Sequence, residues 1–159
     1  WAKKNIFEKA ESNNINSSRI IFANNLPHLE HLERHRHADI FLDTFNYNAH
    51  TTASDALWGG LPIITKQGNQ FAARVASSLL SALDLNELIT HTDEEYEALI
   101  LDYALSSIKL KEIKQKLNRN KNNKPLFNTQ KYTRDFELGM YKIHKLYLNG
   151  EKPRDIKIN

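Results

Sequence analysis

Short apolar runs alternate with helix-like stretches through the middle of this chain, and this alternation restricts its fold more than any other feature of the sequence. The apolar runs are rich in β-branched and aromatic residues, as buried strands are: "RIIFA" (19–23), "DIFLDT" (39–44) and "PIIT" (62–65). The helix-like stretches space their apolar residues by three or four: 28–37, 52–58 and 70–83. Strands that alternate with helices form βαβ units. We therefore expect a Rossmann-like α/β fold, a parallel sheet with helices on both faces.

The rest of the chain is predicted to be helical, apart from its end. Helical spacing continues at 1–14, 93–107, 108–120 and 133–148, and a polar tail follows at 149–159. The 159 residues suffice for one compact domain but not comfortably for two. Because the sequence opens at Trp1 inside a helix-like stretch, without an initiator methionine, we interpret residues 1–159 as a fragment of a longer polypeptide.

Composition excludes several classes of protein. Hydrophobic residues make up 40% of the chain and charged residues 26%, as in ordinary globular domains. The absence of cysteine excludes a disulfide framework, a thiolate metal site and a cysteine nucleophile, and it favours an intracellular, cytoplasmic setting. No apolar run approaches the ~20 residues that a membrane span requires, and the first residues lack the apolar region of a signal peptide. We expect no membrane association.

The basic character of the chain raises the question of nucleic acid. The formal net charge is +3, and much of the excess lies in "KLKEIKQKLNRNKNNK", Lys109–Lys124. Aromatic residues that would stack on bases are not interleaved there, so the pattern favours a solvated helix followed by a basic loop. We expect no nucleic-acid partner.

The loop after the second apolar run carries side chains that suit an anion. The stretch "FNYNAHTTASDALWGGLP" (45–62) places Thr51 and Thr52 at the start of a helix that ends at a Gly-Gly pair. The first turn of a helix has unpaired N–H groups and the positive end of the macrodipole, and therefore attracts phosphate. Threonine hydroxyls and the imidazole of His50 add donors, and Asp55 can accept a hydrogen bond from a sugar hydroxyl.

The same residues also fit a purely structural role. In a capping box, Thr52 would cap the helix while the side chain of Asp55 reaches back to its start. The residues alone leave the choice between cap and ligand site open. The chain lacks a Walker-type lysine loop and a GxGxxG motif, which argues against nucleotide hydrolysis and dinucleotide binding.

A second polar cluster lies in "PHLEHLERHRHAD" (27–39). His28, His31 and His35 are spaced by three and four residues, which puts them on one face of a helix and is compatible with zinc. The order of an HExxH motif is absent, however. A second interpretation pairs His31 with Arg34 near the carboxyl end of "RIIFA", where a nucleotide base and ribose would lie. A solvated helix face is the third, and the residues leave these alternatives open.

The region from Arg19 to about Tyr147 resembles the C-terminal catalytic lobe of the protein O-GlcNAc transferase family, including bacterial members labelled SPINDLY-like. The stretches that carry the resemblance are "LDTFNYNAHTTASDALWGGLP", "FAARVASSLL", "ELITHTDEEYEALILDYA" and "PLFNTQKYTRDFE". The resemblance implies a GT-B glycosyltransferase, in which two Rossmann-like lobes face each other and tetratricopeptide repeats lie upstream. This chain would be the second, nucleotide-sugar-binding lobe. Without the first lobe and the repeats, it is expected to be inactive alone.

The resemblance also implies roles for individual residues. The HTT motif, here His50, Thr51 and Thr52, would contact the donor pyrophosphate, and Asp55 would meet the ribose. In the preceding segment, the residues near the nucleotide would be Leu26, whose backbone meets the uracil, together with His28, His31 and Arg34. His28 departs from the animal enzyme, which has a lysine on the ribose. Gln67-Gly68 departs from relatives that have proline before this glycine.

The implied reaction is the inverting transfer of N-acetylglucosamine from UDP-GlcNAc to Ser or Thr hydroxyls of proteins. We expect no cofactor and no metal ion, because an acidic DxD-like pair is not found at a suitable loop. The expected partners are the nucleotide-sugar donor and protein acceptors, which the missing repeats would select. Two alternatives stay open: protein O-fucosyl transfer from GDP-fucose, as in plant SPINDLY proteins, and a non-catalytic module that binds a nucleotide-sugar or a partner protein.

Overall fold

The computed structural model describes residues 1–158, which fall into two compact units. The first unit, Trp1–His31, contains α1 (Ala2–Ser12), the short 3-10 helix η1 (Ser17–Arg19) and the start of α2 (His28–Arg34). The second unit begins at Leu32 and contains every strand among the described residues. The candidate site described below is built from this second unit.

A parallel sheet forms the centre of the second unit. Its strands are β1 (Phe41–Leu42), β2 (Ile63–Lys66) and β3 (Ile89–Thr90), in the order β1-β2-β3. The register pairs Phe41 with Ile63 and Thr65 with Ile89. Parallel strands joined through helices confirm the α/β fold that the alternating sequence pattern predicts.

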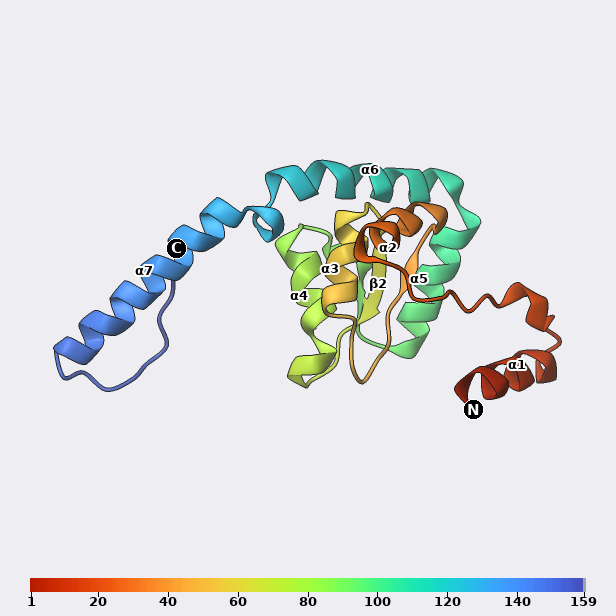
Figure 1. The fold of residues 1–159 in the computed structure, drawn as a ribbon, viewed down its shortest axis with the longest axis horizontal. Helices are drawn as coiled ribbons and strands as arrows, with labels where there is room; N and C mark the ends of the chain where they lie inside the picture. The colour runs from red at the N-terminus through yellow and green to blue at the C-terminus, as the bar shows by residue number, and fades with distance from the viewer. Residues whose placement is uncertain (159) are drawn as a thin grey trace. The chain divides into compact units, whose positions relative to one another are not determined.

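Helices cover both faces of this sheet. Figure 1 shows α3 (Thr51–Trp58) and α4 (Val75–Ala82) on one side of β2 and α5 (Asp93–Leu105) on the other, and all three helices contact β2. The buried core between these layers is aliphatic: Leu57, Ile63, Ile64, Leu80, Leu83, Leu85, Leu88 and Leu117. The remaining elements are α6 (Ser107–Asn123), α7 (Thr129–Leu148) and the 3-10 helices η2 (His35–His37), η3 (Phe71–Ala73), η4 (Asn86–Leu88) and η5 (Pro125–Phe127).

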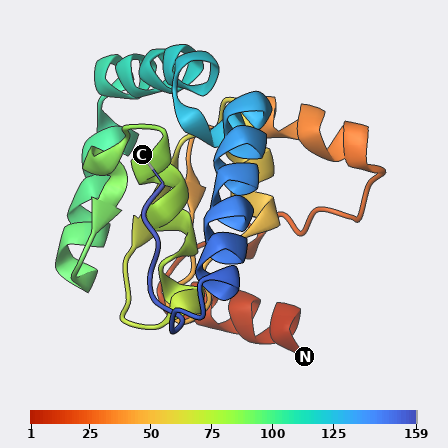
Figure 2. The same cartoon turned by 90° about the vertical axis from the view of Figure 1, so that its left-hand side faces the viewer.

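α6 closes one end of the layers, as both views show (Figure 1 and Figure 2). Its side chains reach the last residue of α3, where Lys121 Nζ donates to the Trp58 carbonyl at 3.2 Å, and the end of α4, where Asn120 donates to the Leu83 carbonyl at 2.7 Å. Lys114 pairs with Asp39, just before β1. α6 therefore packs at the edge where the strands begin, on the opposite side of the sheet from their carboxyl ends.

Several lysines of the basic stretch 109–124 form ion pairs within the domain. Their acidic partners lie on other segments: Lys109 with Asp102, Lys114 with Asp39, Lys116 with Glu87, and Lys124 with Asp84. The hydrogen bond from Lys124 lowers the pKa of Asp84. These pairs offset much of the local positive charge and hold α6 to its neighbours, in agreement with a structural role for this stretch.

The predicted strand at 19–23 is wrong. This segment follows η1 and has extended backbone at Ile20, but among residues 1–158 it pairs with no strand. Ile21 is 86% exposed, and the ring of Phe22 packs edge-on against Phe7 of α1, with ring centroids 5.4 Å apart. Phe22 therefore packs on a helix of its own unit, whereas Ile21 is exposed.

Other element boundaries also differ from the prediction. The helix expected at 70–83 is split into η3 and α4, because Arg74 (φ −128°, ψ 0°) leaves the helical conformation between them. The helix expected at 28–37 ends as an α-helix at Arg34, so that His35 does not continue the face of His28 and His31. β3 has only two residues and was not predicted.

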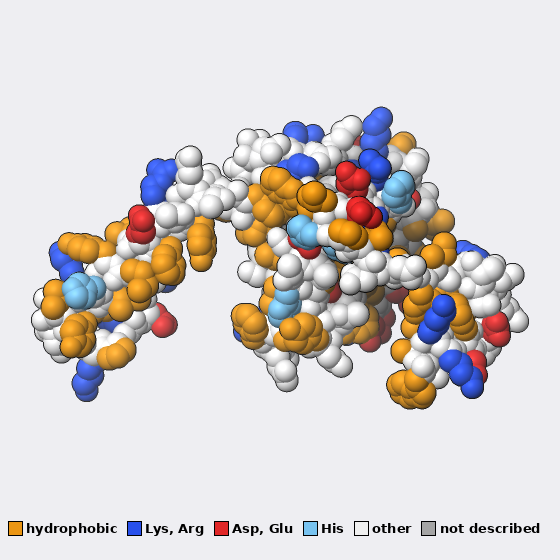
Figure 3. Space-filling model, viewed as in Figure 1, with side chains coloured by type: hydrophobic (Ala, Val, Ile, Leu, Met, Phe, Trp, Pro, Cys, Tyr) orange, Lys and Arg blue, Asp and Glu red, His pale blue; other side chains and the backbone are white. Residues whose placement is uncertain are grey.

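α7 carries an exposed apolar face, which Figure 3 shows as a run of hydrophobic side chains. None of its residues is buried, and five large ones repeat at steps of three and four: Tyr132, Phe136, Met140, Ile143 and Tyr147. The polar tail returns along this helix, where Lys142 Nζ donates to the Lys157 carbonyl at 3.1 Å. Within residues 1–158, no helix combines the length and apolar character needed to cross a bilayer.

Candidate functional site

The loop between β1 and α3 places the start of α3, with its unpaired backbone N–H groups, at the carboxyl edge of the sheet. His50 is the N-cap of α3, but its side chain makes no capping hydrogen bond to the helix. Its carbonyl accepts the first hydrogen bond of the helix, from the Ser54 N–H at 3.1 Å. None of the described residues accepts a hydrogen bond from the N–H groups of Thr51, Thr52 and Ala53, the first three residues of the helix. Three amides pointing along the helix axis at its positive end form a ready site for an anion.

The structure does not form the capping box that the residues also allowed. Thr52 lies inside the first turn of α3, one residue after the helix begins, so its hydroxyl is not at the capping position. Among residues 1–158, no hydrogen bond or ion pair engages the hydroxyl of Thr52 or the carboxylate of Asp55. Both side chains are therefore available to a ligand.

The imidazole of His50 is held between two aromatic rings. It stacks on the ring of Tyr47, with centroids 4.6 Å apart and ring planes 16° apart. It also packs nearly perpendicular to the ring of Phe71, with centroids 6.1 Å apart. Its Nε2 lies 3.4 Å from the Ala72 carbonyl, which can only accept, so Nε2 carries hydrogen in this contact. Nδ1 has no partner among the described residues, and a protonated ring can donate from it to an anion.

The β2–α4 loop forms the second wall beside His50. Gly68 donates to the Ala73 carbonyl at 2.8 Å, and a Cβ at Gly68 would come within 2.7 Å of the Ala73 Cβ. This close approach turns the chain back so that the Ala72 carbonyl accepts from the Asn48 N–H at 2.8 Å as well as facing His50. The Gln67-Gly68 pair therefore supports the wall beside His50.

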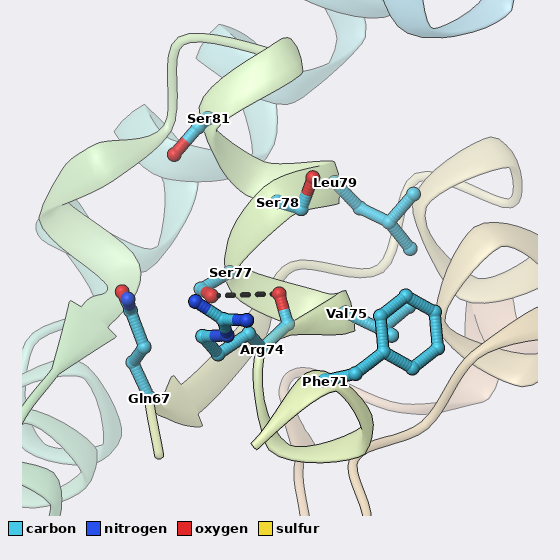
Figure 4. A pocket seen from close by; sticks show the side chains of 8 residues that line it. All are labelled: Gln67, Phe71, Arg74, Val75, Ser77, Ser78, Leu79 and Ser81. Atoms are coloured by element: carbon cyan, nitrogen blue, oxygen red, sulfur yellow. Dashed lines mark hydrogen bonds between the residues drawn. The ribbon is translucent and has the colours of Figure 1, made fainter. Parts of the chain in front are cut away.

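A hollow adjoins this wall on the side of α4 (Figure 4). It has a volume of about 550 Å³ and is lined by Gln67, Phe71, Arg74, Val75, Ser77, Ser78, Leu79 and Ser81. The guanidinium of Arg74 has no hydrogen-bond or ion-pair partner among the described residues, whereas its backbone N–H donates to the Phe71 carbonyl at 3.0 Å and its carbonyl accepts from the Ser77 hydroxyl at 2.9 Å. Phe71, which contacts His50, is also one of the residues that line the hollow.

The remaining predicted site residues lie in or near α2. Leu26, His28 and His31 belong to the first unit, and Arg34 belongs to the second. The approach of these four residues to a donor bound beside His50 stays a prediction. His35 is buried, and its Nδ1 donates to the Leu32 carbonyl at 3.2 Å. Across residues 1–158, no group of three or more His, Asp or Glu side chains is arranged to hold a metal ion.

A buried polar network behind the loop was not predicted from the sequence. One carboxylate oxygen of Asp43 accepts from the backbone N–H groups of Thr44 (2.9 Å) and Ala49 (2.7 Å), and the other accepts from the Thr65 hydroxyl (2.6 Å). The Asp43 carbonyl accepts from the Tyr96 hydroxyl at 2.9 Å. No pattern in the sequence indicates these contacts, because "FLDT" is equally typical of an exposed strand end.

Tyr96 should make stability sensitive to alkaline pH. Burial, together with the charge of Asp43, raises its pKa to about 12. Tyrosine in the unfolded chain loses its proton near pH 10, so ionisation favours the unfolded state between about pH 10 and 12 and stability is lost as pH rises. We expect the free energy of unfolding to fall between pH 9 and 11 by about 1 kcal/mol more in the wild type than in Tyr96→Phe. Urea titrations at both pH values measure this difference, and equal losses would contradict it.

A Rossmann-like unit whose open helix start faces the carboxyl edge of a parallel sheet is the arrangement of proteins that bind phosphorylated ligands. The family model for glycosyl transferase family 41 matches residues 2–136. The chain therefore belongs to glycosyl transferase family 41.

Relatives in plants and animals carry related names. The chain is 34% identical over 150 residues to the probable UDP-N-acetylglucosamine–peptide N-acetylglucosaminyltransferase SEC of Arabidopsis thaliana, covering 94% of this chain and 15% of that protein. It is 34% identical over 136 residues to the UDP-N-acetylglucosamine–peptide N-acetylglucosaminyltransferase of Caenorhabditis elegans, covering 86% and 12%. The barley (Hordeum vulgare) relative named SPINDLY is 32% identical over 124 residues, covering 78% and 13%. The chain thus spans less than a sixth of these relatives.

A solved structure shows the same fold. A mutant of the O-GlcNAc transferase of Thermobaculum terrenum superposes with a TM-score of 0.72 at 29% sequence identity, over 76% of this chain and 23% of that one. The superposition confirms the fold as that of part of a GT-B enzyme.

Proposed function

We propose that this chain is the donor-binding lobe of an inverting glycosyltransferase that moves N-acetylglucosamine from UDP-GlcNAc to Ser or Thr hydroxyls of proteins. One observation carries the proposal: in a member of glycosyl transferase family 41, the first amides of α3 are unpaired and stand beside His50, Thr51 and Thr52. The names of the relatives supply the donor and the peptide acceptor. We call the three side chains and these amides the diphosphate cradle.

The cradle acts on the leaving group. The acceptor oxygen bonds to the anomeric carbon while the bond from that carbon to the donor phosphate oxygen breaks, and UDP departs with the electron pair. The acceptor proton passes to a base that we do not assign to this chain. As the bond breaks, negative charge grows on the diphosphate, where the amides, the hydroxyls of Thr51 and Thr52 and the imidazole of His50 stabilise it. Groups fixed before the reaction lower the barrier without reorganising.

We further propose that these donors take the place of a metal ion, so that the reaction needs no metal and no other cofactor. Asp55 would hold the ribose from the next turn of α3, since its carboxylate is unpaired among residues 1–158. Leu26, His28, His31 and Arg34 would meet the uracil and ribose. Acceptor selection is assigned to tetratricopeptide repeats, as the family resemblance implies, and the absence of cysteine favours the cytoplasm as the setting.

Calorimetry tests the proposed function on the chain itself. Titration with UDP should give saturable binding, whereas GDP should bind at least tenfold more weakly. Tighter binding of GDP would replace the proposal with the fucosyl-transfer alternative. Binding of neither nucleotide would favour an interaction module and contradict the proposal. Titrations of UDP with EDTA and with Mg²⁺ should give the same affinity if no metal is needed.

Asp55→Asn should weaken donor binding without unfolding the chain. The amide keeps the size of the side chain but removes the charge that strengthens a hydrogen bond from a ribose hydroxyl. We expect a five- to tenfold higher Kd for UDP in calorimetry, on the order of 1 kcal/mol, with Tm within about 2 °C of the wild type. A lowered Tm with unchanged UDP affinity would show instead that Asp55 stabilises α3.

A further inference from the structure

We propose that Asp43 is a positioning residue for the diphosphate cradle: it never touches the donor, but it fixes the loop that presents His50 and the start of α3. The inference rests on the proposed function, because it concerns the same site. Asp43 is buried, with 4% of its surface exposed, and both of its carboxylate oxygens are engaged by the protein. It is therefore unsuited to contact a ligand or to exchange protons with one.

The carboxylate closes the loop by binding both of its ends. One oxygen accepts from the Thr44 N–H at the start of the loop and from the Ala49 N–H at its end, directly before His50. Hydrogen bonds from backbone amides to a carboxylate are stronger than those between neutral groups. The two bonds therefore hold six residues in one closed turn.

Further contacts inside the loop act in the same direction. The Thr44 hydroxyl donates to the Tyr47 carbonyl at 2.5 Å, and the side-chain amide of Asn48 donates to the Thr44 carbonyl at 2.7 Å. Residues 43–52 contain no glycine, so the turn is stabilised by side-chain hydrogen bonds rather than by residues with a freer backbone. Tyr47, which these bonds fix, is the ring on which His50 stacks.

The second carboxylate oxygen connects the loop to the sheet. It accepts from the hydroxyl of Thr65 on β2, and the Thr65 carbonyl accepts in turn from the hydroxyl of Thr90 on β3 at 3.0 Å. Asp43 and Thr65 are both buried at the carboxyl edge of the sheet, whereas Thr90 contacts only the backbone of Thr65 and does not reach the carboxylate. The loop is thereby held to the central sheet.

A fixed loop matters for binding because a mobile one must be ordered when the donor arrives. Ordering a mobile residue costs conformational entropy, and this cost subtracts from the affinity. Freeing the Ala49 amide would release the residue next to His50, and the cradle would bind the diphosphate more weakly even in a folded chain.

Two threonines offer a matched test of this role. Thr65→Val and Thr90→Val each remove one hydroxyl from a buried site of the same sheet and keep the side-chain shape, but only Thr65 contacts Asp43. We expect Thr65→Val to raise the Kd for UDP by fivefold or more, and Thr90→Val by less than twofold. Both are to be measured by calorimetry at a temperature well below the Tm of each variant.

Two Asp43 variants complete the test. Asp43→Ala should raise the Kd for UDP by tenfold or more, and Asp43→Asn should stay within threefold, because an amide can accept from the two N–H groups and donate to Thr65. If Asp43→Ala does not fold, the threonine pair decides. Equal UDP affinities in Thr65→Val and Thr90→Val would overturn the positioning role. If the wild-type chain fails to bind UDP, the proposed function itself fails, and the two failures are thus distinguished.

Discussion

Thr52→Ala should lower the rate of sugar transfer by the active full-length protein by about a hundredfold, and His50→Ala should do the same. Removing one preorganised donor to a developing negative charge commonly costs about 3 kcal/mol of transition-state stabilisation, which corresponds to this loss. Thr52 is exposed and its hydroxyl is unpaired among residues 1–158, so folding should barely change. We expect the free energy of unfolding to stay within about 0.5 kcal/mol for Thr52→Ala.

The control is a threonine at another helix start. Thr129 is exposed at the first position of α7, as Thr51 is at that of α3, and lies outside the cradle. Thr129→Ala should leave the turnover number within about twofold, since it removes no donor to the leaving group. Turnover and urea unfolding measured on the three variants separate catalysis from stability. Wild-type turnover in Thr52→Ala and His50→Ala would refute the assigned role of the cradle.

Leu57→Ala should have the largest effect on stability among single substitutions in the same helix. Leu57 is fully buried in the core beneath α3. Truncating a buried leucine removes its transfer free energy and leaves a cavity, which together cost about 3–4 kcal/mol. We expect urea unfolding to show a loss of this size, a large share of the 5–15 kcal/mol that holds a typical domain folded.

Leu105→Ala provides the comparison. Leu105 ends α5 and is 85% exposed, so its truncation should cost less than about 0.5 kcal/mol. A loss below about 1 kcal/mol for Leu57→Ala would show that α3 is not anchored by this core and that the cradle stands on a mobile helix. The two positions thus measure how firmly the sheet holds the start of α3.

Sequence periodicity predicted most of the helices and strands, but not all of their boundaries. "PIIT" has strong β-branched character and a Gly-Gly stop before it, and β2 lies within one residue of the prediction. β3 was not predicted because a strand of two residues is too short to show a periodic pattern. Its pairing depends on Thr65 and Lys66 of the neighbouring strand. The segment 19–23 has strand-like residues, but residue preference alone does not supply a pairing partner.

The candidate site also contains residues that local sequence rules indicate and residues that only the packing of distant segments reveals. His50, Thr51 and Thr52 follow from local rules, because a helix start and its donors are contiguous in sequence. Phe71 and Ala72 meet His50 from more than 20 residues away, and Asp43 acts through Thr65 on the next strand. Such contacts arise from packing of distant segments. No spacing rule in the sequence indicates them.

A crystal structure of the chain with bound UDP tests the central claim most directly. The diphosphate oxygens should lie within about 3 Å of the N–H groups of Thr51 and Thr52 and of the Thr52 hydroxyl. The imidazole of His50 should face the diphosphate from its position between Tyr47 and Phe71. A structure with UDP bound elsewhere on the chain, and the first turn of α3 without a phosphate, would contradict the account.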